Sequence, residues 1–323
     1  MPVYRILEIL GDVTRYVDSF ILFFGTLGNL LSICVFTRLT IFRGNQCAFY
    51  LNIEAFANIF ALMIQSIDRF TQYPDGSTLA DFKFIWCRAR FFLDQCSQLI
   101  PFSIVCLTTF DQILSTSPFY SLRQLSTMKL ARRSISIAII ASIIHSIPAM
   151  FSFGIYPPVG CISIDYAAGY YYLFVYYPIL VGILPLFLSS IFSLIAYRNV
   201  RRLIRRQIPM VRRRLDRQLT AMVFTRVILM IIFCLPFTIY RIYALQAVFK
   251  TNYNFTMIIN RILRFLTNLL RNINHAVRII LTREPPRVIL FVWAHLLLIG
   301  RTHSIDRSHK RICAQSLLLL LRY

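Results

Sequence analysis

The stretch SFILFFGTLGNLLSICVFT, residues 19–37, contains no charged side chain. A helix of this length rises about 29 Å, which is close to the thickness of the hydrocarbon core of a bilayer. Two longer stretches, 134–164 and 166–197, also lack Asp, Glu, Lys and Arg. Each is long enough to hold a membrane span together with part of a loop, so the sequence predicts an all-α membrane protein.

The composition of the chain agrees with this fold class. Of its 323 residues, 57% are hydrophobic, and the mean hydropathy is +0.63, which is too apolar for a soluble domain of this size. We expect a seven-transmembrane helix bundle over residues 17–281, preceded by a short extracellular segment, residues 1–16. The expected spans are 17–38, 46–69, 84–112, 133–154, 172–198, 218–244 and 255–281.

The net charge of +22 comes from basic residues that collect in alternate gaps between the spans. Examples are Arg38, Arg123 and the arginine-rich segment 198–217. The positive-inside rule places these gaps in the cytosol and the N-terminus outside. We therefore expect a multi-pass protein of the plasma membrane in contact with lipid. The basic gaps contain few aromatic residues, which argues against a nucleic-acid partner.

The first 16 residues hold both acidic and basic side chains and lack the order of a cleavable signal, so we expect the first span to act as the signal anchor. No motif of a metalloprotease, serine hydrolase or phosphate-binding loop is found in the sequence. His145 is an isolated histidine, and we expect a structural role for it. The sequence thus predicts no enzyme activity, no cofactor and no metal site.

Two of the eight cysteines differ from the others in their expected location. Cys87 and Cys161 both fall near the outer surface in the predicted topology, on the side that is oxidising after secretion. A disulfide between them is one interpretation, and two unpaired thiols are the other.

Several motifs occur in an order and spacing that resemble a rhodopsin-like (class A) seven-helix G-protein-coupled receptor of the invertebrate peptide or orphan kind. The likeness covers about residues 17–277. The motifs are Gly25-Thr-Leu-Gly28-Asn29, Ala55-Phe-Ala57-Asn58, Cys87 followed after 24 residues by Asp111-Gln112, Pro185, and Phe233-Cys-Leu-Pro236 with Asp216 20 residues before that proline. The resemblance implies that an extracellular peptide or amine signals to a cytosolic heterotrimeric G protein. A polytopic transporter or a non-signalling receptor-like protein is the alternative.

The resemblance places Asp94 at the position that binds the amine of the ligand, seven residues after Cys87. Gln95, Gln98 and Tyr176 are its expected neighbours in the ligand site. The alternative is that Asp94 forms an ion pair with Arg90, which lies four residues earlier on the same helix face.

The resemblance also implies an activation switch at the cytosolic end, formed by Asp111, Gln112, Asp216 and Pro236. Gln112 replaces the arginine of the family, so a hydrogen bond to Asp216 would lack charge assistance from Gln112. A pair of Asp216 with one of the arginines 212 and 213 on its own helix is the alternative. Pro236 is expected to kink the sixth span and to serve as a pivot.

Buried polar groups are expected in the first two spans. Asn29 and Asn58 either hydrogen-bond each other or a water in the bundle, or bond neighbouring carbonyl groups. Asn58 replaces the family's acid and removes the charge that helps to bind sodium, so we expect no sodium site there. For Glu54 we expect a side chain that reaches the inner membrane surface, with partial replacement of the missing acid as the alternative.

The last part of the sequence departs from the family pattern. After Val277 the residues of the seventh-helix motif are missing, and Arg278 stands where the motif begins. Residues 282–323 form an atypical tail that suggests an altered reading frame, with a divergent tail as the alternative. Asn254-Phe-Thr256 is a glycosylation sequon in the last expected outer loop.

Overall fold

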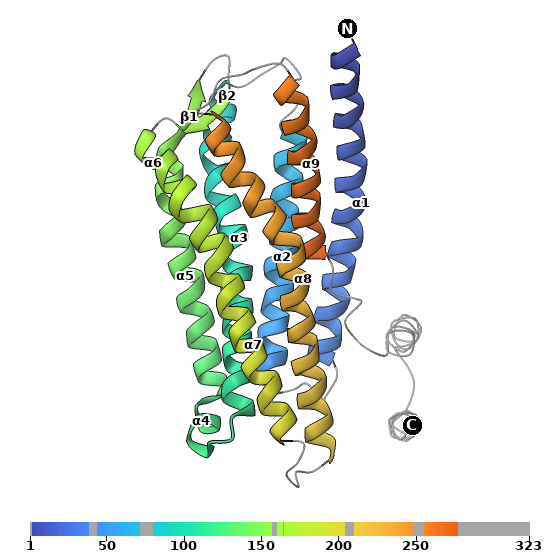
Figure 1. The fold of residues 1–323 in the computed structure, drawn as a ribbon, viewed down its shortest axis with the longest axis vertical. Coiled ribbons are helices and arrows are strands. Elements are labelled where there is room, and N and C mark those ends of the chain that lie inside the picture. The colour runs from blue at the N-terminus through green and yellow to red at the C-terminus, as the bar shows by residue number, and fades with distance from the viewer. Residues whose placement is uncertain are drawn as a thin grey trace, which may run out of the picture. The chain divides into compact units, whose positions relative to one another are not determined.

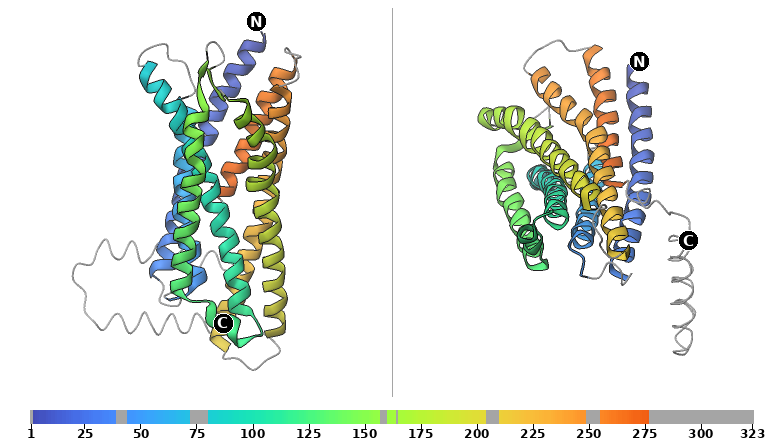
Figure 2. Two further views of the ribbon diagram at one scale, coloured as in Figure 1. Left: turned by 90° about the vertical axis from the view of Figure 1, so that its left-hand side faces the viewer. Right: turned by 60° about the horizontal axis from the view of Figure 1, so that its bottom comes forward.

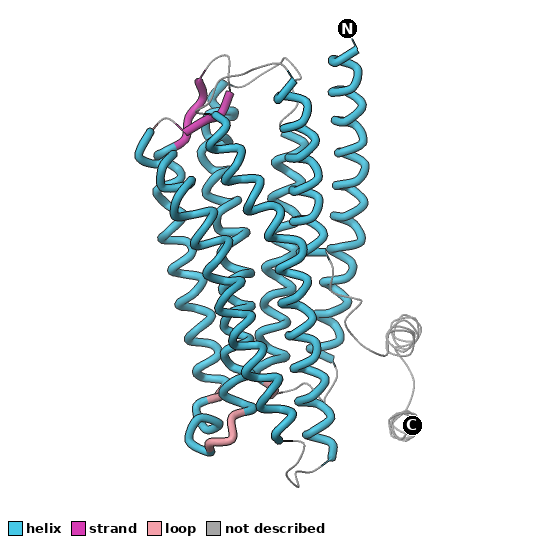
Figure 3. Tube along the Cα trace, viewed as in Figure 1, coloured by secondary structure: helices cyan, strands magenta, loops and turns pink. Residues whose placement is uncertain are grey.

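A computed structural model describes residues 2–38, 44–71, 80–156, 160–163, 165–203, 210–248 and 255–276. All of them belong to one compact unit, Met1–Leu281. Helices make up almost all of this unit (Figure 3). The sequon at Asn254 and the tail 282–323 lie outside the described residues.

Long helices lie side by side along the bundle axis (Figure 1). The helices are α1 (Pro2–Arg38), α2 (Gln46–Thr71), α3 (Ala80–Thr116), α4 (Tyr120–Leu125), α5 (Met128–Ser152), α6 (Tyr166–Tyr171), α7 (Leu184–Leu203), α8 (Met210–Val248) and α9 (Phe255–Ala276), and a π-helical segment, Tyr172–Ile183, joins α6 to α7. Helix α3 packs against α2, α5, α7 and α8, whereas α1 packs against α2 and α9, and α8 against α7 and α9. Helices α1, α2, α3, α7, α8 and α9 therefore form a closed ring of neighbours, and α5 packs against α3 from outside this ring. Two further views show the bundle from other sides (Figure 2).

Six helical stretches in the described residues are long and apolar enough to cross a membrane, judged by length and composition. They correspond to the first six predicted spans. Helix α9, the predicted seventh span, carries Arg264, Arg271 and His275 and is not among them. It nevertheless packs against α1, α2 and α8. The structure therefore has an all-α, membrane-type architecture whose last described helix is more polar than the others.

Element boundaries differ from the prediction in two places. Helix α1 begins at Pro2, so the segment 1–16, predicted to precede the first span, is largely helical. The uncharged stretch 134–164 contains a hairpin after α5, in which β1 (Phe153–Tyr156) pairs antiparallel with β2 (Gly160–Ser163). An uninterrupted apolar stretch carries no signal that separates a helix from a short buried strand, which is why the prediction missed the hairpin.

Two glycines allow close contacts between helices. A Cβ at Gly25 of α1 would lie 2.8 Å from the Cβ of Ala276 in α9 and 2.8 Å from Cδ1 of Leu62 in α2. A Cβ at Gly182 would lie 2.7 Å from Cγ2 of Thr238 in α8. Small residues of this kind let membrane helices approach closely, because packing and hydrogen bonds drive their association.

An aromatic core fills the space between α3, the π-helical segment and α8. Its largest members are Phe102, Tyr172, Tyr176, Tyr177 and Phe237. Tyr176 and Phe237 are each 1% exposed. This core lies next to the polar residues described below and fixes their surroundings.

Candidate functional site

Asp94 of α3 forms an ion pair with α9. Nη1 of Arg271 lies 3.3 Å from Oδ1 of Asp94, and Nε2 of Gln98 donates a hydrogen bond of 2.8 Å to Oδ2. Arg271 is therefore a partner of Asp94, and the guanidinium of Arg90 lies over the ring of Phe91. Sequence spacing pointed to Arg90 because it considers only neighbours on one helix.

The surroundings of this ion pair are aromatic and largely dry. The guanidinium carbon of Arg271 lies 4.5 Å from the ring centroid of Phe237, a distance that allows a cation–π interaction. The side chains of Arg271 and Asp94 are 7% and 24% exposed. The attraction between Arg271 and Asp94 and the contact of Arg271 with the Phe237 ring offset part of the free-energy cost of removing both charges from water. The partly exposed carboxylate remains the most accessible group of the pair.

Three of the four residues predicted to bind ligand lie near one another. Asp94 and Gln98 share a hydrogen bond, and Tyr176 is close enough to Asp94 and Arg271 to interact with them electrostatically. The hydroxyl of Tyr176, Oε1 of Gln98 and Nε of Arg271 are buried and have no hydrogen-bond partner within the described part of the chain. These atoms are available to a polar ligand group.

Gln95, the fourth predicted ligand residue, has a different contact. Its Nε2 donates a hydrogen bond of 2.5 Å to the hydroxyl of Tyr172. Gln95 is 4% exposed and Tyr172 is 7% exposed. The bond joins α3 to the π-helical segment and positions the aromatic core. Gln95 therefore acts on the site indirectly, through Tyr172.

A second polar cluster lies deeper in the bundle. Nε of Arg226 in α8 lies 2.8 Å from Oε1 of Glu54 in α2, and the two side chains are 4% and 1% exposed. Nη1 of Arg226 also donates to Oδ1 of Asn274 in α9, at 2.5 Å. The expectation that Glu54 reaches the membrane surface is therefore wrong. Because the buried cation beside it neutralises its charge, the Glu54 carboxylate does not need to reach water.

Asn29 and Asn58 lie beside this cluster but do not bond each other. Nδ2 of Asn29 donates to the carbonyl oxygens of Gly25 at 2.8 Å and of His275 at 3.0 Å. Oδ1 of Asn58 is 2.8 Å from Nδ1 of His275. The alternative reading, bonds to neighbouring carbonyls, holds for Asn29, whereas Asn58 bonds a ring nitrogen on α9. Both asparagines therefore connect their helices to α9.

At the opposite end of α3, the predicted switch residues contact two other elements. Oγ of Ser126, which follows α4, donates 2.9 Å to Oδ1 of Asp111. Oγ1 of Thr220 in α8 donates 2.9 Å to Oε1 of Gln112. Asp216 lies one turn before Thr220 on α8, and its side chain is outside the described ones. Gln112 thus does contact α8, through a hydroxyl group without charge.

The structure describes Cys87 and Pro236, whereas their predicted roles as a bridge to Cys161 and as a pivot stay predictions. Cys87 is 3% exposed and disulfide-bonded. Cys161 lies on β2 opposite Ile155, and its side chain is outside the described ones, so the pairing of the two cysteines stays a prediction. Pro236 lies inside the uninterrupted helix α8.

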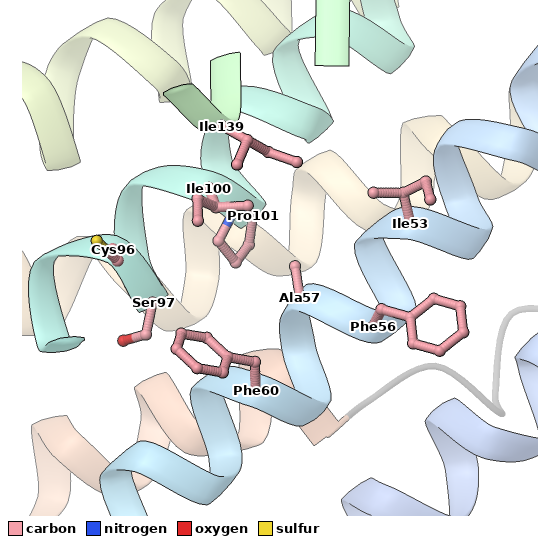
Figure 4. Close-up of a pocket in the computed structure, with 9 residues that line it drawn as sticks. All are labelled: Ile53, Phe56, Ala57, Phe60, Cys96, Ser97, Ile100, Pro101 and Ile139. Atoms are coloured by element: carbon pink, nitrogen blue, oxygen red, sulfur yellow. The ribbon is translucent and has the colours of Figure 1, made fainter. Parts of the chain in front are cut away.

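An apolar pocket opens between α2, α3 and α5 (Figure 4). Its volume is about 320 Å³, and Phe56, Phe60 and Ile139 are among the side chains that line it. The lining offers almost no polar atom. This pocket has none of the directional groups that select a polar ligand, and we do not place the signalling site there.

Sequence reasoning missed Arg226, Arg271, Asn274 and His275 as functional candidates. A charged residue inside a predicted span is by itself a signal of function. That signal applies to Arg226, which lies in the span predicted at 218–244.

No group of three or more potential metal ligands occurs among the described residues.

The comparisons with known proteins add no family to these observations. No protein-family model matches this chain, and no curated protein matches it. Any functional assignment therefore rests on the sequence motifs and on the two polar clusters of the bundle.

Proposed function

We propose that this chain is a plasma-membrane receptor of the seven-helix, G-protein-coupled kind. In this proposal an extracellular peptide or amine binds beside Asp94, and a heterotrimeric G protein binds at the arginine-rich end of the bundle. The observation that carries the proposal is the placement of polar contacts at separate levels of an apolar bundle. Each level joins α3 or α2 to α8, to α9 or to both.

The ion pair of Asp94 suggests how a ligand acts. A ligand ammonium group that approaches Asp94 competes with Arg271 for the same carboxylate. Binding would therefore exchange an internal ion pair between α3 and α9 for one between α3 and the ligand. Because the pair is partly desolvated, the exchange is specific for a cation that also fits the aromatic walls.

The contact between α3 and α8 supports the other end of the pathway. Gln112 and Thr220 are 4% and 3% exposed, so a movement of α8 away from α3 opens a buried surface. Surfaces that open on activation are suitable docking sites for a partner, since their exposure depends on the state of the receptor.

The test is ligand-driven nucleotide exchange on purified heterotrimeric G proteins, screened with amines and short peptides. Asp94→Asn keeps the shape and removes the charge, so an active cation should lose about 2–5 kcal/mol of binding, roughly 30-fold or more. Asp12→Asn, at a carboxylate that is 58% exposed on α1, is the matched control and should respond as the wild type. Equal affinity of wild type and Asp94→Asn for every active compound would contradict the assignment of Asp94.

A transporter is the second candidate, and the Glu54–Arg226 pair is the observation that favours it. Ionisable residues inside a membrane commonly mark ion or substrate pathways. Uptake of a solute into vesicles that carry the chain, without nucleotide exchange on any G protein, would identify transport instead of signalling.

A further inference from the structure

We infer that Glu54, Arg226 and Asn274 form a latch that holds the arginine-rich end of α8 inside the bundle and that opens by rotation of α8 about Pro236. The inference rests on the proposed function, because it describes how that receptor is kept inactive. The latch joins three helices, since Glu54 belongs to α2, Arg226 to α8 and Asn274 to α9.

The contacts of the latch are short and buried. Arg226 donates through Nε to Glu54 at 2.8 Å and through Nη1 to Asn274 at 2.5 Å. Glu54 and Asn274 are 1% and 0% exposed, and Arg226 is 3% exposed. Charge-assisted hydrogen bonds of this kind are about twice as strong as neutral ones. The pair therefore resists a displacement of α8 more than a neutral contact does.

Pro236 is the point about which the part of α8 that carries Arg226 can rotate. A proline cannot donate to the carbonyl of Ile232, so α8 is weakened at that turn. Arg226 precedes Pro236 by ten residues, or about 15 Å along the helix. A rotation of about 11° at the proline therefore moves Arg226 by about 3 Å, enough to separate it from Glu54. Thr220 lies about 24 Å from the pivot and moves by about 5 Å, which also breaks its bond to Gln112.

The latch is incompletely satisfied in the closed bundle. Nη2 of Arg226 and Nδ2 of Asn274 are buried donors with no partner within the described part of the chain. Buried donors without partners are unfavourable, and they regain hydrogen bonds when water enters. The closed state thus combines a strong ion pair with unsatisfied donors. This combination brings the free energies of the closed and open states closer together, as a switch requires.

The latch replaces a charge that the resemblance leads one to expect elsewhere. Gln112 carries no charge, so its contact with Thr220 is a neutral hydrogen bond. The ion pair of Arg226 with Glu54 is, by contrast, a charged contact between α8 and another helix. This charged restraint on α8 therefore lies in the core between α2 and α9.

The test measures the position of α8 in the full chain in lipid nanodiscs, without G protein or ligand. Spin labels carried by unnatural amino acids replace the exposed residues Ala221 on α8 and Ser136 on α5. Pulsed dipolar spectroscopy then gives the distance between the two helices. The wild type should show mainly one short distance. Glu54→Gln should raise the long-distance population roughly ten- to a hundredfold, the effect of losing a charged hydrogen bond.

Two further variants and one control complete the design. Asn274→Ala, which removes the second acceptor of Arg226, should also raise the long-distance population. The charge reversal Glu54→Arg with Arg226→Glu should restore the short distance. Asp18→Asn is the matched control, because Asp18 is a buried carboxylate on α1 that accepts from Asn272 of α9 at 3.1 Å. It should leave the distance between α8 and α5 unchanged.

Unchanged distances in both Glu54→Gln and Asn274→Ala would overturn the latch, as would a charge reversal that leaves α8 in the long-distance state. If Glu54→Gln fails to fold, the distance in Asn274→Ala decides the question. If the distances change as expected but no G protein responds to any variant, the latch stands and the proposed function fails. The two ideas therefore fail in different measurements.

Discussion

The substitution Gly25→Ala tests whether α9 packs inside the bundle, as its contacts with α1 and α2 require. The added Cβ would lie 2.8 Å from both Ala276 and Leu62, whereas ordinary contact begins at 3.4 Å. Helix α9 must therefore move away from α1 by several tenths of an ångström. The hydrogen bond from Asn29 to the carbonyl of His275, now 3.0 Å, would then be stretched beyond a favourable length.

Two destabilising contributions and one stabilising contribution determine the expected change in unfolding free energy. Overpacking costs about 1–3 kcal/mol, and a weakened buried hydrogen bond costs about 1 kcal/mol. Replacing a helical glycine by alanine returns about 0.5–1 kcal/mol. We therefore expect Gly25→Ala to destabilise the bundle by about 1–3 kcal/mol, measured by reversible denaturant unfolding in mixed lipid–detergent micelles.

Gly169→Ala is the matched control for this substitution. Gly169 also lies in a helix, α6, but nothing lies within 4 Å of a Cβ placed there. This variant should be unchanged or more stable by up to about 1 kcal/mol. Equal stability changes in the two variants would refute the close packing of α1, α2 and α9 around Gly25.

Three other predictions concern separate parts of the chain. Peptide mapping under non-reducing conditions should find Cys87 linked to Cys161, a crosslink worth roughly 3–5 kcal/mol; recovery of both as free thiols would exclude it. Glycosidase treatment should shift the mobility of the expressed protein through loss of a glycan at Asn254, and Asn254→Gln should abolish the shift; absence of any shift would show that the sequon is unused. Thr220→Val should lower the unfolding free energy by about 1–3 kcal/mol, because Oε1 of Gln112 is left buried without its donor; an unchanged value would mean that this contact contributes nothing.

Much of the bundle could be predicted from the sequence, because long uncharged stretches separated by basic gaps are a strong signal of membrane helices. The first six predicted spans overlap the six apolar helical stretches of the structure. The signal fails for segments that are apolar but not simply helical. Strand β1 and the π-helical segment lie within or beside uncharged stretches, and their backbone geometry leaves no periodic pattern in the sequence.

For the polar clusters, the sequence allowed prediction of several members but not of their partners. Asn29, Asn58, Glu54 and Asp94 stand out because each is a polar residue in an apolar span. Their partners do not follow from local spacing, since the nearest candidate on the same helix competes with residues far along the chain. Glu54 and Arg226 are separated by 172 positions, and only the packed bundle brings them together.

Helix α9 was predicted as the seventh span, but the partners of its polar residues were not predicted. Arg271, Asn274 and His275 make it more polar than the six apolar helical stretches. In the bundle, these three residues are buried and contact Asp94, Arg226 and Asn58 respectively. A polar face directed at other polar groups is compatible with a helix inside a membrane protein, because each group then has a partner away from lipid.

Basal nucleotide exchange by Glu54→Gln tests the central claim most directly, since it requires no knowledge of the ligand. Nanodiscs that carry this variant, the wild type or no receptor are incubated with purified heterotrimers of each G-protein class, and binding of a labelled GTP analogue is followed over time. Our account predicts faster exchange with the variant than with the wild type and the empty discs, for at least one class. Exchange no faster than in empty discs for every class, with the variant folded and α8 in its long-distance state, would contradict the assignment as a G-protein-coupled receptor.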